Sequence, residues 1–128
     1  MAELSELGAL TQRPIYFIPP FEWHNADHSA WAKELGCQMI NFTPGTGSQR
    51  DYAPEGHEAF VSSEKIIQDI LDHEKSSRTG LNGHLLLLHL GSERKDKTYS
   101  KLNELIDELM KRNYLLVRID QLLQDAGD

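Results

Sequence analysis

Several side chains capable of acid–base or binding chemistry stand directly after apolar segments of this 128-residue chain. His89 lies near the end of the apolar run at 84–90, and an imidazole can donate or accept a proton near neutral pH. Asp51 and Tyr52 follow a second apolar run, and a carboxylate beside an imidazole can orient it and favour its protonated form. The other residues in equivalent places are Glu22, Trp23, His24, Arg118 and Asp120. Histidine, carboxylates and aromatic rings together would suit hydrolysis of a sugar-like substrate.

Four short apolar runs, at 15–18, 38–42, 84–90 and 114–119, must position these side chains. None alternates cleanly between apolar and polar residues, which is typical of strands buried on both faces of a parallel sheet. Helical periodicity fills the stretches between them, and a short helix is expected after Asp120. Ser62 or Ser63 can cap the second of these helices, and Gly36 can end the first. The order predicts a parallel α/β layer, in which ligands bind at the carboxyl ends of the strands.

The segment 43–61 is long and irregular, and such loops in compact domains are usually functional. Its sequence PGTGSQR, at 44–50, invites comparison with a phosphate-binding loop. It lacks the terminal Gly-Lys-Ser/Thr of that motif and no helical pattern follows it directly. Its glycines therefore indicate a tight turn rather than a nucleotide site.

Each candidate also has a purely structural interpretation. A lone histidine after an apolar strand is more often structural than catalytic, and Trp23 and Tyr52 could simply pack at a rim. Asp51 could serve as a turn residue in a glycine-rich loop. His24 and His28 have the i,i+4 spacing of a helical metal pair, but no third ligand accompanies them. We therefore predict no metal site in this chain.

Composition narrows the class of protein. The length suits one domain, and a net charge of −7 argues against a nucleic-acid partner, which needs a basic face. Cys37 is the only cysteine, so an internal disulfide cannot form. Residues 1–12 lack the basic start and continuous apolar core of a signal peptide, and no apolar run is long enough for a membrane span. These features predict a cytoplasmic protein without a membrane partner.

Three segments in this order, YFIPPFEW at 16–23, NFTPGTGSQRDY at 41–52 and LLLLHLGS at 85–92, resemble the C-terminal half of NodB-type polysaccharide deacetylases. KRNYLLVRIDQLL, at 111–123, is similar to the last strand and closing helix of that domain. The resemblance covers the chain from about Gly8 onward. It implies a single domain over 1–128, a partial (β/α) barrel with about four parallel strands and flanking helices. It also implies removal of N- or O-acetyl groups from a carbohydrate.

The resemblance also implies roles for individual residues. His89 would be the general acid that protonates the departing amine or alkoxide, and Asp51 would orient and tune it. Tyr52 would stand where the family often has tryptophan, and Leu87 would line the pocket for the acetyl methyl group. Pro19, Pro20 and Phe21 would form one wall of the substrate groove, and Trp23 would contact the substrate.

The chain departs from the family pattern in its metal and base motifs. The family binds a divalent metal such as zinc through an aspartate and two histidines in earlier segments, and its base is another aspartate there. Neither motif precedes IPPFEW, and Ile18 stands where many members have arginine. The HNADH pair, at 24–28, comes later and is not matched to the metal ligands. We therefore expect a C-terminal portion with little activity alone and a first strand whose open edge favours self-association.

Two other interpretations remain open. The chain could be a non-catalytic α/β module that binds a carbohydrate or a protein through the segment 43–61. It could also be a flavodoxin-like or receiver-like domain, since these share the order of strands and helices. The lack of an acidic cluster and of an aspartate at an early strand end argues against the latter.

Overall fold

The computed structural model describes residues 15–125. The chain groups into two compact units, Met1–Asn41 and Phe42–Asp128. A single domain over the whole length stays a prediction. The segment 1–12, where the sequence pattern did not predict a signal peptide, lies outside the described residues. None of the helices within 15–125 combines the length and the apolar character needed to cross a bilayer.

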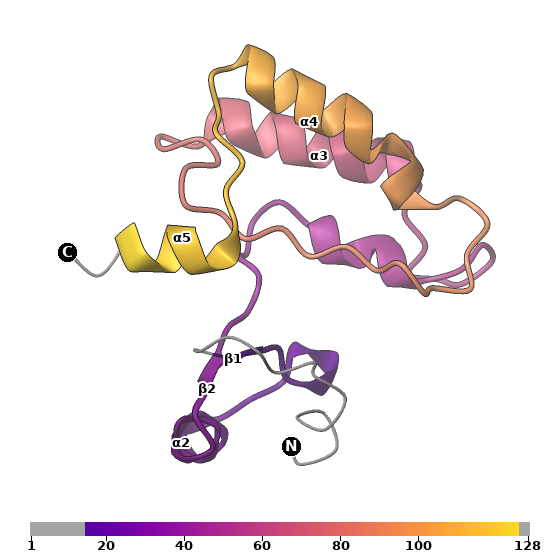
Figure 1. Cartoon of the computed structure of the whole chain (residues 1–128). Helices are drawn as coiled ribbons and strands as arrows, with labels where there is room; N and C mark the ends of the chain where they lie inside the picture. The colour runs from indigo at the N-terminus through magenta and orange to yellow at the C-terminus, as the bar shows by residue number, and fades with distance from the viewer. Residues whose placement is uncertain (1–14, 126–128) are drawn as a thin grey trace. The chain divides into compact units, whose positions relative to one another are not determined.

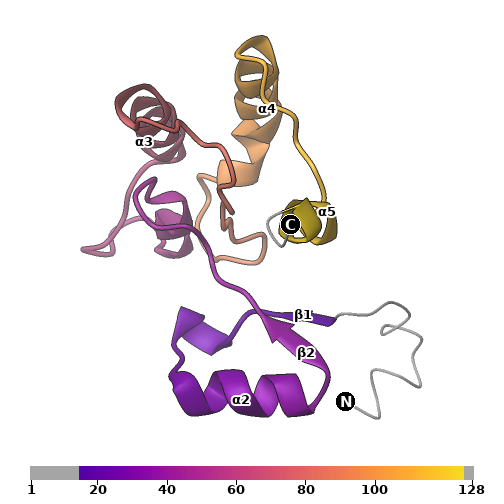
Figure 2. The same cartoon turned by 90° about the vertical axis from the view of Figure 1, so that its left-hand side faces the viewer.

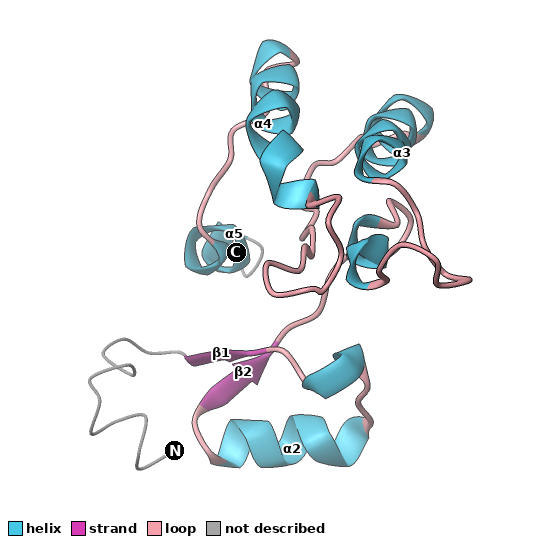
Figure 3. Cartoon of the chain, turned by 90° about the vertical axis from the view of Figure 1, so that its right-hand side faces the viewer, coloured by secondary structure: helices cyan, strands magenta, loops and turns pink. Residues whose placement is uncertain are grey.

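The first unit contains a strand–helix–strand arrangement (Figures 2 and 3). Strand β1, Ile15–Phe17, pairs in parallel with β2, Cys37–Met39, with Ile15 opposite Cys37. Between them lie the short 3-10 helix η1, Pro20–Glu22, and the helix α2, Ala26–Glu34. The chain leaves α2 through Gly36, whose φ of 73° is accessible to glycine at little cost, as the sequence predicted.

Helix α2 begins with a capping box. The Asn25 side chain accepts from the His28 backbone amide at 3.0 Å, and the Asn25 amide donates to His28 Nδ1 at 3.3 Å. In and just after this helix, Ala32 is buried, whereas Trp31 and Leu35 are largely exposed.

The second unit is built on two packed helices, α3, Ser63–Ser76, and α4, Leu102–Lys111, which lie side by side (Figure 1). The Ser62 hydroxyl accepts from the Lys65 amide at 3.2 Å and caps α3, as predicted. Their shared core consists of Ile66, Ile67, Ile70, Leu81, Leu105 and Leu109. Each of these side chains contributes about 1.5–3 kcal/mol by leaving water, so this cluster is the main stabilising feature of the unit.

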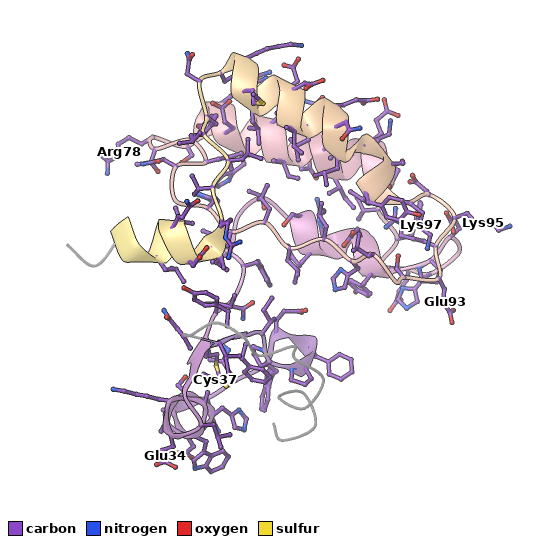
Figure 4. All side chains as sticks on the ribbon, in the orientation of Figure 1. Glu34, Cys37, Arg78, Glu93, Lys95 and Lys97 are labelled. Atoms are coloured by element: carbon purple, nitrogen blue, oxygen red, sulfur yellow. The ribbon has the colours of Figure 1, made fainter. Side chains whose placement is uncertain are left out.

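Three shorter elements complete the second unit. These are the 3-10 helices η2, Ser48–Tyr52, and η3, Thr98–Lys101, and the helix α5, Ile119–Asp125. The sequence predicted the start of the terminal helix at Asp120, one residue after its observed start at Ile119. Figure 4 shows the exposed side chains of Lys95 and Glu93 pointing outward from the loop before η3.

The expected four-stranded layer differs from what is observed. Residues 15–125 contain two strands, and neither 84–90 nor 114–119 is classed as a strand. A backbone hydrogen bond joins the run 84–90 to the residues after β2, from the Thr43 amide to the Leu85 carbonyl at 2.9 Å. An apolar run predicts burial, but a strand also needs a ladder of partners. The described architecture is mixed α/β with a two-stranded parallel sheet, and a barrel is not seen within it.

Candidate functional site

Asp51 lies on η2, and a tight turn holds this helix in place. Gly47 precedes η2 with a φ of 69°, and a Cβ there would lie 2.6 Å from Arg50 Nε. Arg50 Nε donates to the Gly47 carbonyl at 3.1 Å, so the side chain closes over its own turn. The glycine is thus required for the turn, as the sequence indicated, and it leaves Asp51 buried with 1% of its surface exposed.

An ion-pair cluster ties η2 to α3. Asp69, on α3, accepts from both Arg50 and Lys65. Partial burial alone would raise the pKa of Asp69, but the Lys65 ammonium and the Arg50 guanidinium hold the pKa of this carboxyl below its usual value. The segment that carries Asp51 is therefore fixed to α3 through Arg50.

Both carboxylate oxygens of Asp51 contact the same residue, His89. The His89 backbone amide donates to Oδ2 at 2.8 Å, and the ring nitrogen Nδ1 lies 2.7 Å from Oδ1. An ionised carboxylate only accepts hydrogen bonds, so with Asp51 ionised the proton of a neutral imidazole resides on Nδ1. The His89 side chain is 32% exposed whereas that of Asp51 is 1% exposed. The predicted meeting of these two side chains is present.

Tyr52 and Leu87 also belong to this neighbourhood. The Tyr52 ring lies edge-on to the His89 ring, with centroids 6.3 Å apart, and Tyr52 is half exposed. Leu87 is partly buried and lies two residues before His89, and its backbone amide donates to Ser48 Oγ at 3.2 Å. Because side chains alternate along an extended segment, Leu87 and His89 face the same way.

The loop that follows His89 is anchored by a buried arginine. Arg94 is 1% exposed, donates to the Val61 carbonyl at 2.8 Å and the Asp96 carbonyl at 2.6 Å, and lies over the Phe60 ring at 4.8 Å. Burial alone would raise the pKa of Asp96. The hydrogen bonds from Ser63 and the charge of Arg94 have the larger effect, so the pKa of this carboxyl lies below its usual value. The chain is thus held on both sides of His89.

The residues of the first unit that were predicted to bind substrate, Pro20, Phe21 and Trp23, are exposed to solvent. Pro20 and Phe21 lie in η1, and Trp23 follows it. Phe21 is 93% exposed and Trp23 is 77% exposed. Phe21 and Glu22 both have a φ of 56°, a left-handed conformation that costs a non-glycine residue about 1–3 kcal/mol. These residues belong to a different unit from His89, so a shared cleft stays a prediction.

The paired histidines have structural contacts. His28 accepts in the capping box and its ring lies 5.6 Å from that of Trp31, while His24 Nδ1 lies 3.4 Å from the Glu22 carbonyl. Arg118 and Asp120, which the sequence placed at the same rim as His89, pair with one another at 3.0 Å. Among residues 15–125, no group of three or more His, Cys, Asp or Glu side chains is arranged so that it could hold a metal ion.

The second unit also has a polar groove, which lies partly on the segment 43–61 that the sequence suggested as a binding loop. It has a volume of about 670 Å³ and is lined by Gly45, Thr46, Gly47, Gln49, Arg50, Asp69, Asp72, His73 and Ser76. The absence of a side chain at Gly45 opens it, because a Cβ there would lie 2.6 Å from His73 Cε1. The sequence signals for it were the length of the segment 43–61 and its glycine pair, whereas the contribution of α3 to the groove was not predicted. None of the predicted site residues lines it.

Comparison with known proteins gives one informative match. The chain is 28% identical over 113 residues to a peptidoglycan-N-acetylglucosamine deacetylase of Bacillus cereus. The match covers 88% of this chain and 47% of that protein, so the chain spans about half the length of the curated relative. No family model matches the chain, and no solved structure matches it significantly. The similarity indicates a distant relationship to polysaccharide deacetylases.

Proposed function

We propose that this chain is part of a NodB-type polysaccharide deacetylase domain, which hydrolyses N- or O-acetyl groups on a carbohydrate. The observation that carries the proposal is the double contact of Asp51 with the amide and the ring of His89. The similarity to a deacetylase supports the choice of substrate class. The partial barrel with about four parallel strands is part of this proposal.

His89 acts as the general acid in this proposal. Water adds to the acetyl carbonyl, and when the resulting tetrahedral adduct collapses, the bond from carbon to the sugar nitrogen or oxygen breaks. His89 Nε2–H gives its proton to that departing atom, so the products are acetate and a free amine or hydroxyl. Asp51 holds the ring through Nδ1, which leaves Nε2 as the nitrogen that donates. Leu87 and Tyr52 contact the acetyl group and the sugar.

In this proposal, three residues of the first unit bind the carbohydrate. Pro20, Phe21 and Trp23 offer a rigid proline and two exposed aromatic faces, which suit stacking against a pyranose ring. The left-handed backbone of Phe21 holds its ring outward at a conformational cost, as binding residues often do.

A divalent metal such as zinc is implied by the resemblance, but the residues described here do not form a site for one. Addition of zinc or cobalt to the isolated chain should leave hydrolysis of an acetylated chito-oligosaccharide near background. Robust turnover by the chain alone would contradict the assignment of metal and base to residues outside it.

A binding titration tests the proposal without requiring turnover. ¹⁵N-labelled chain is titrated with an N-acetylglucosamine tetramer and, as the matched control, with the fully deacetylated tetramer. We expect the acetylated sugar to shift the signals of His89, Tyr52 and Leu87, and the deacetylated one to shift them much less. Equal responses to both sugars, or none at His89, would contradict an acetyl-binding role.

A second candidate is the non-catalytic binding module, which is favoured by the polar groove on the segment 43–61 and α3. A groove of about 670 Å³ is large enough for a small ligand, and its acids, amide and guanidinium suit sugar hydroxyls. In the same titration this function would shift Gly45, Gly47 and Ser76 while leaving His89 unchanged.

A further inference from the structure

The segment that ends at His89 is held by a regular series of side-chain acceptors. The three bonds are Leu85 N–H to Thr43 Oγ1 at 3.0 Å, Leu87 N–H to Ser48 Oγ at 3.2 Å and His89 N–H to Asp51 Oδ2 at 2.8 Å. Every second amide along an extended segment points toward the same edge. Three side chains therefore do here what a neighbouring strand does in a sheet.

The geometry of η2 matches this spacing. Ser48 and Asp51 are three residues apart, and in a 3-10 helix such side chains lie above one another, about 6 Å apart along the axis. Two residues of extended chain span about 6.6 Å. The two acceptors on this face of η2 therefore have nearly the same spacing as the two amides that they bind.

Ser48 is enclosed, so its hydroxyl has little freedom. The residue is 0% exposed, and its own amide donates to the buried Thr46 Oγ1 at 3.4 Å. Removing the hydroxyl would leave the Leu87 amide without this acceptor in a partly buried place, which is costly. After this change, η2 would still hold the segment 85–89 through the bond from the His89 amide to the Asp51 carboxylate.

We infer that Ser48 is a positioning residue for His89, and that Thr43 assists it. Acceptors at every second amide define the register of the segment, and a slip of one residue would turn His89 to the opposite side. The backbone bond from Thr43 to the Leu85 carbonyl fixes the start of the series. The significance of this inference rests on the proposed role of His89, but the contacts that it concerns can be measured without substrate.

The test compares Ser48→Ala with Ser63→Ala in the full chain by NMR. Ser63 is a control of equal burial, since it is also 0% exposed, and its hydroxyl contacts the Asp96 carbonyl, Thr98 Oγ1 and Arg94 Nη2 in the loop after His89 rather than the amides of the segment 85–89. We expect Ser48→Ala to speed exchange of the Leu87 and His89 amides by about fivefold to tenfold over the change in global stability. The His89 ring nitrogens should also shift toward a mixture of the two tautomers.

Ser63→Ala should leave the His89 ring signals and the relative protection of both amides unchanged. If Ser48→Ala unfolds the chain, Thr43→Val provides a second variant of nearly the same shape, and its effect at Leu85 and His89 should have the same direction. Unchanged His89 ring signals in a folded Ser48→Ala or Thr43→Val chain would overturn the inference. Because no substrate is present, failure of the deacetylase proposal would leave this result intact, and the reverse also holds.

Discussion

The two carboxylate oxygens of Asp51 contact the backbone amide and the ring of His89. An amide side chain has only one oxygen and cannot make both contacts as an acceptor. Asp51→Asn keeps the shape but leaves one acceptor oxygen where two are used. We expect the unfolding free energy to fall by about 1–3 kcal/mol, the usual cost of a lost buried bond. The His89 ring should lose its fixed Nδ1–H tautomer.

Urea unfolding and ¹⁵N shifts of the imidazole measure these two effects. Asp120→Asn is the control, because Asp120 is partly buried and pairs with the exposed Arg118, so its loss should change stability little. An Asp51→Asn chain with wild-type stability and an unchanged His89 tautomer would show that the contact does not hold the ring.

Asp69 makes the attachment of η2 to α3 dependent on pH. Its pKa in the folded chain is below the ordinary value of 3.8, so the unfolded chain binds more protons in this range. The ion pairs with Arg50 and Lys65 therefore stabilise the fold fully above the unfolded-state pKa, and this contribution is lost as the pH falls through the lowered folded-state pKa.

Unfolding free energies measured between pH 6 and pH 2 should therefore fall more steeply for the wild type than for Asp69→Asn. Asp72→Asn, which changes an exposed carboxyl on the same helix, should follow the wild-type curve. Parallel curves for the wild type and Asp69→Asn would contradict a lowered pKa at Asp69.

Part of this site was accessible from the sequence. His89, Asp51 and Tyr52 were predicted to meet because each follows an apolar run, and the chain does bring them together. Thr43 and Ser48 were missed, because a hydroxyl in an irregular segment has no periodic pattern, and its partner is an amide about 40 residues away. The placing of Pro20, Phe21 and Trp23 beside His89 stays a prediction.

Helices α3 and α4 were predictable because burial on one face imposes a period of 3.6 on the residues of each helix. Extended segments behave differently, since an apolar run indicates that a segment is buried and not which backbone lies next to it. The run 84–90 illustrates this, because the hydroxyls of Thr43 and Ser48 take amides that a strand partner would otherwise bind. Helix existence could thus be predicted, and strand pairing could not.

The contact between α3 and α4 should dominate the stability of the second unit. Leu105 is 1% exposed in the core formed with Ile66 and Ile70, so Leu105→Ala removes packed atoms and leaves a cavity. We expect a loss of about 2–5 kcal/mol in the free energy of unfolding. Met110→Ala, on the same helix at a residue 60% exposed, should cost less than about 1 kcal/mol.

Urea titration followed by far-ultraviolet circular dichroism compares the two variants. Equal losses for Leu105→Ala and Met110→Ala would show that the α3–α4 contact is not the principal core of this unit.

At the scale of the whole molecule, the two-stranded sheet bears on how copies of the chain interact. Within residues 15–125, β1 pairs with β2 alone, so each strand has a second edge that the sheet itself does not use. Isolated two-stranded sheets are marginal, and open edges tend to acquire strands from other chains. We therefore predict that the chain self-associates through the edge of β1, with a sedimentation coefficient that rises with concentration.

A lysine on an edge strand opposes such pairing, because its charge would have to be brought against another copy. Phe17→Lys, at a residue of β1 that is 40% exposed, should shift the association to higher concentration by about tenfold or more. Leu35→Lys adds the same charge at a residue 61% exposed just after α2, and should leave the association unchanged. A wild-type chain that stays monomeric across the series, or equal responses of the two variants, would exclude the edge of β1 as the contact.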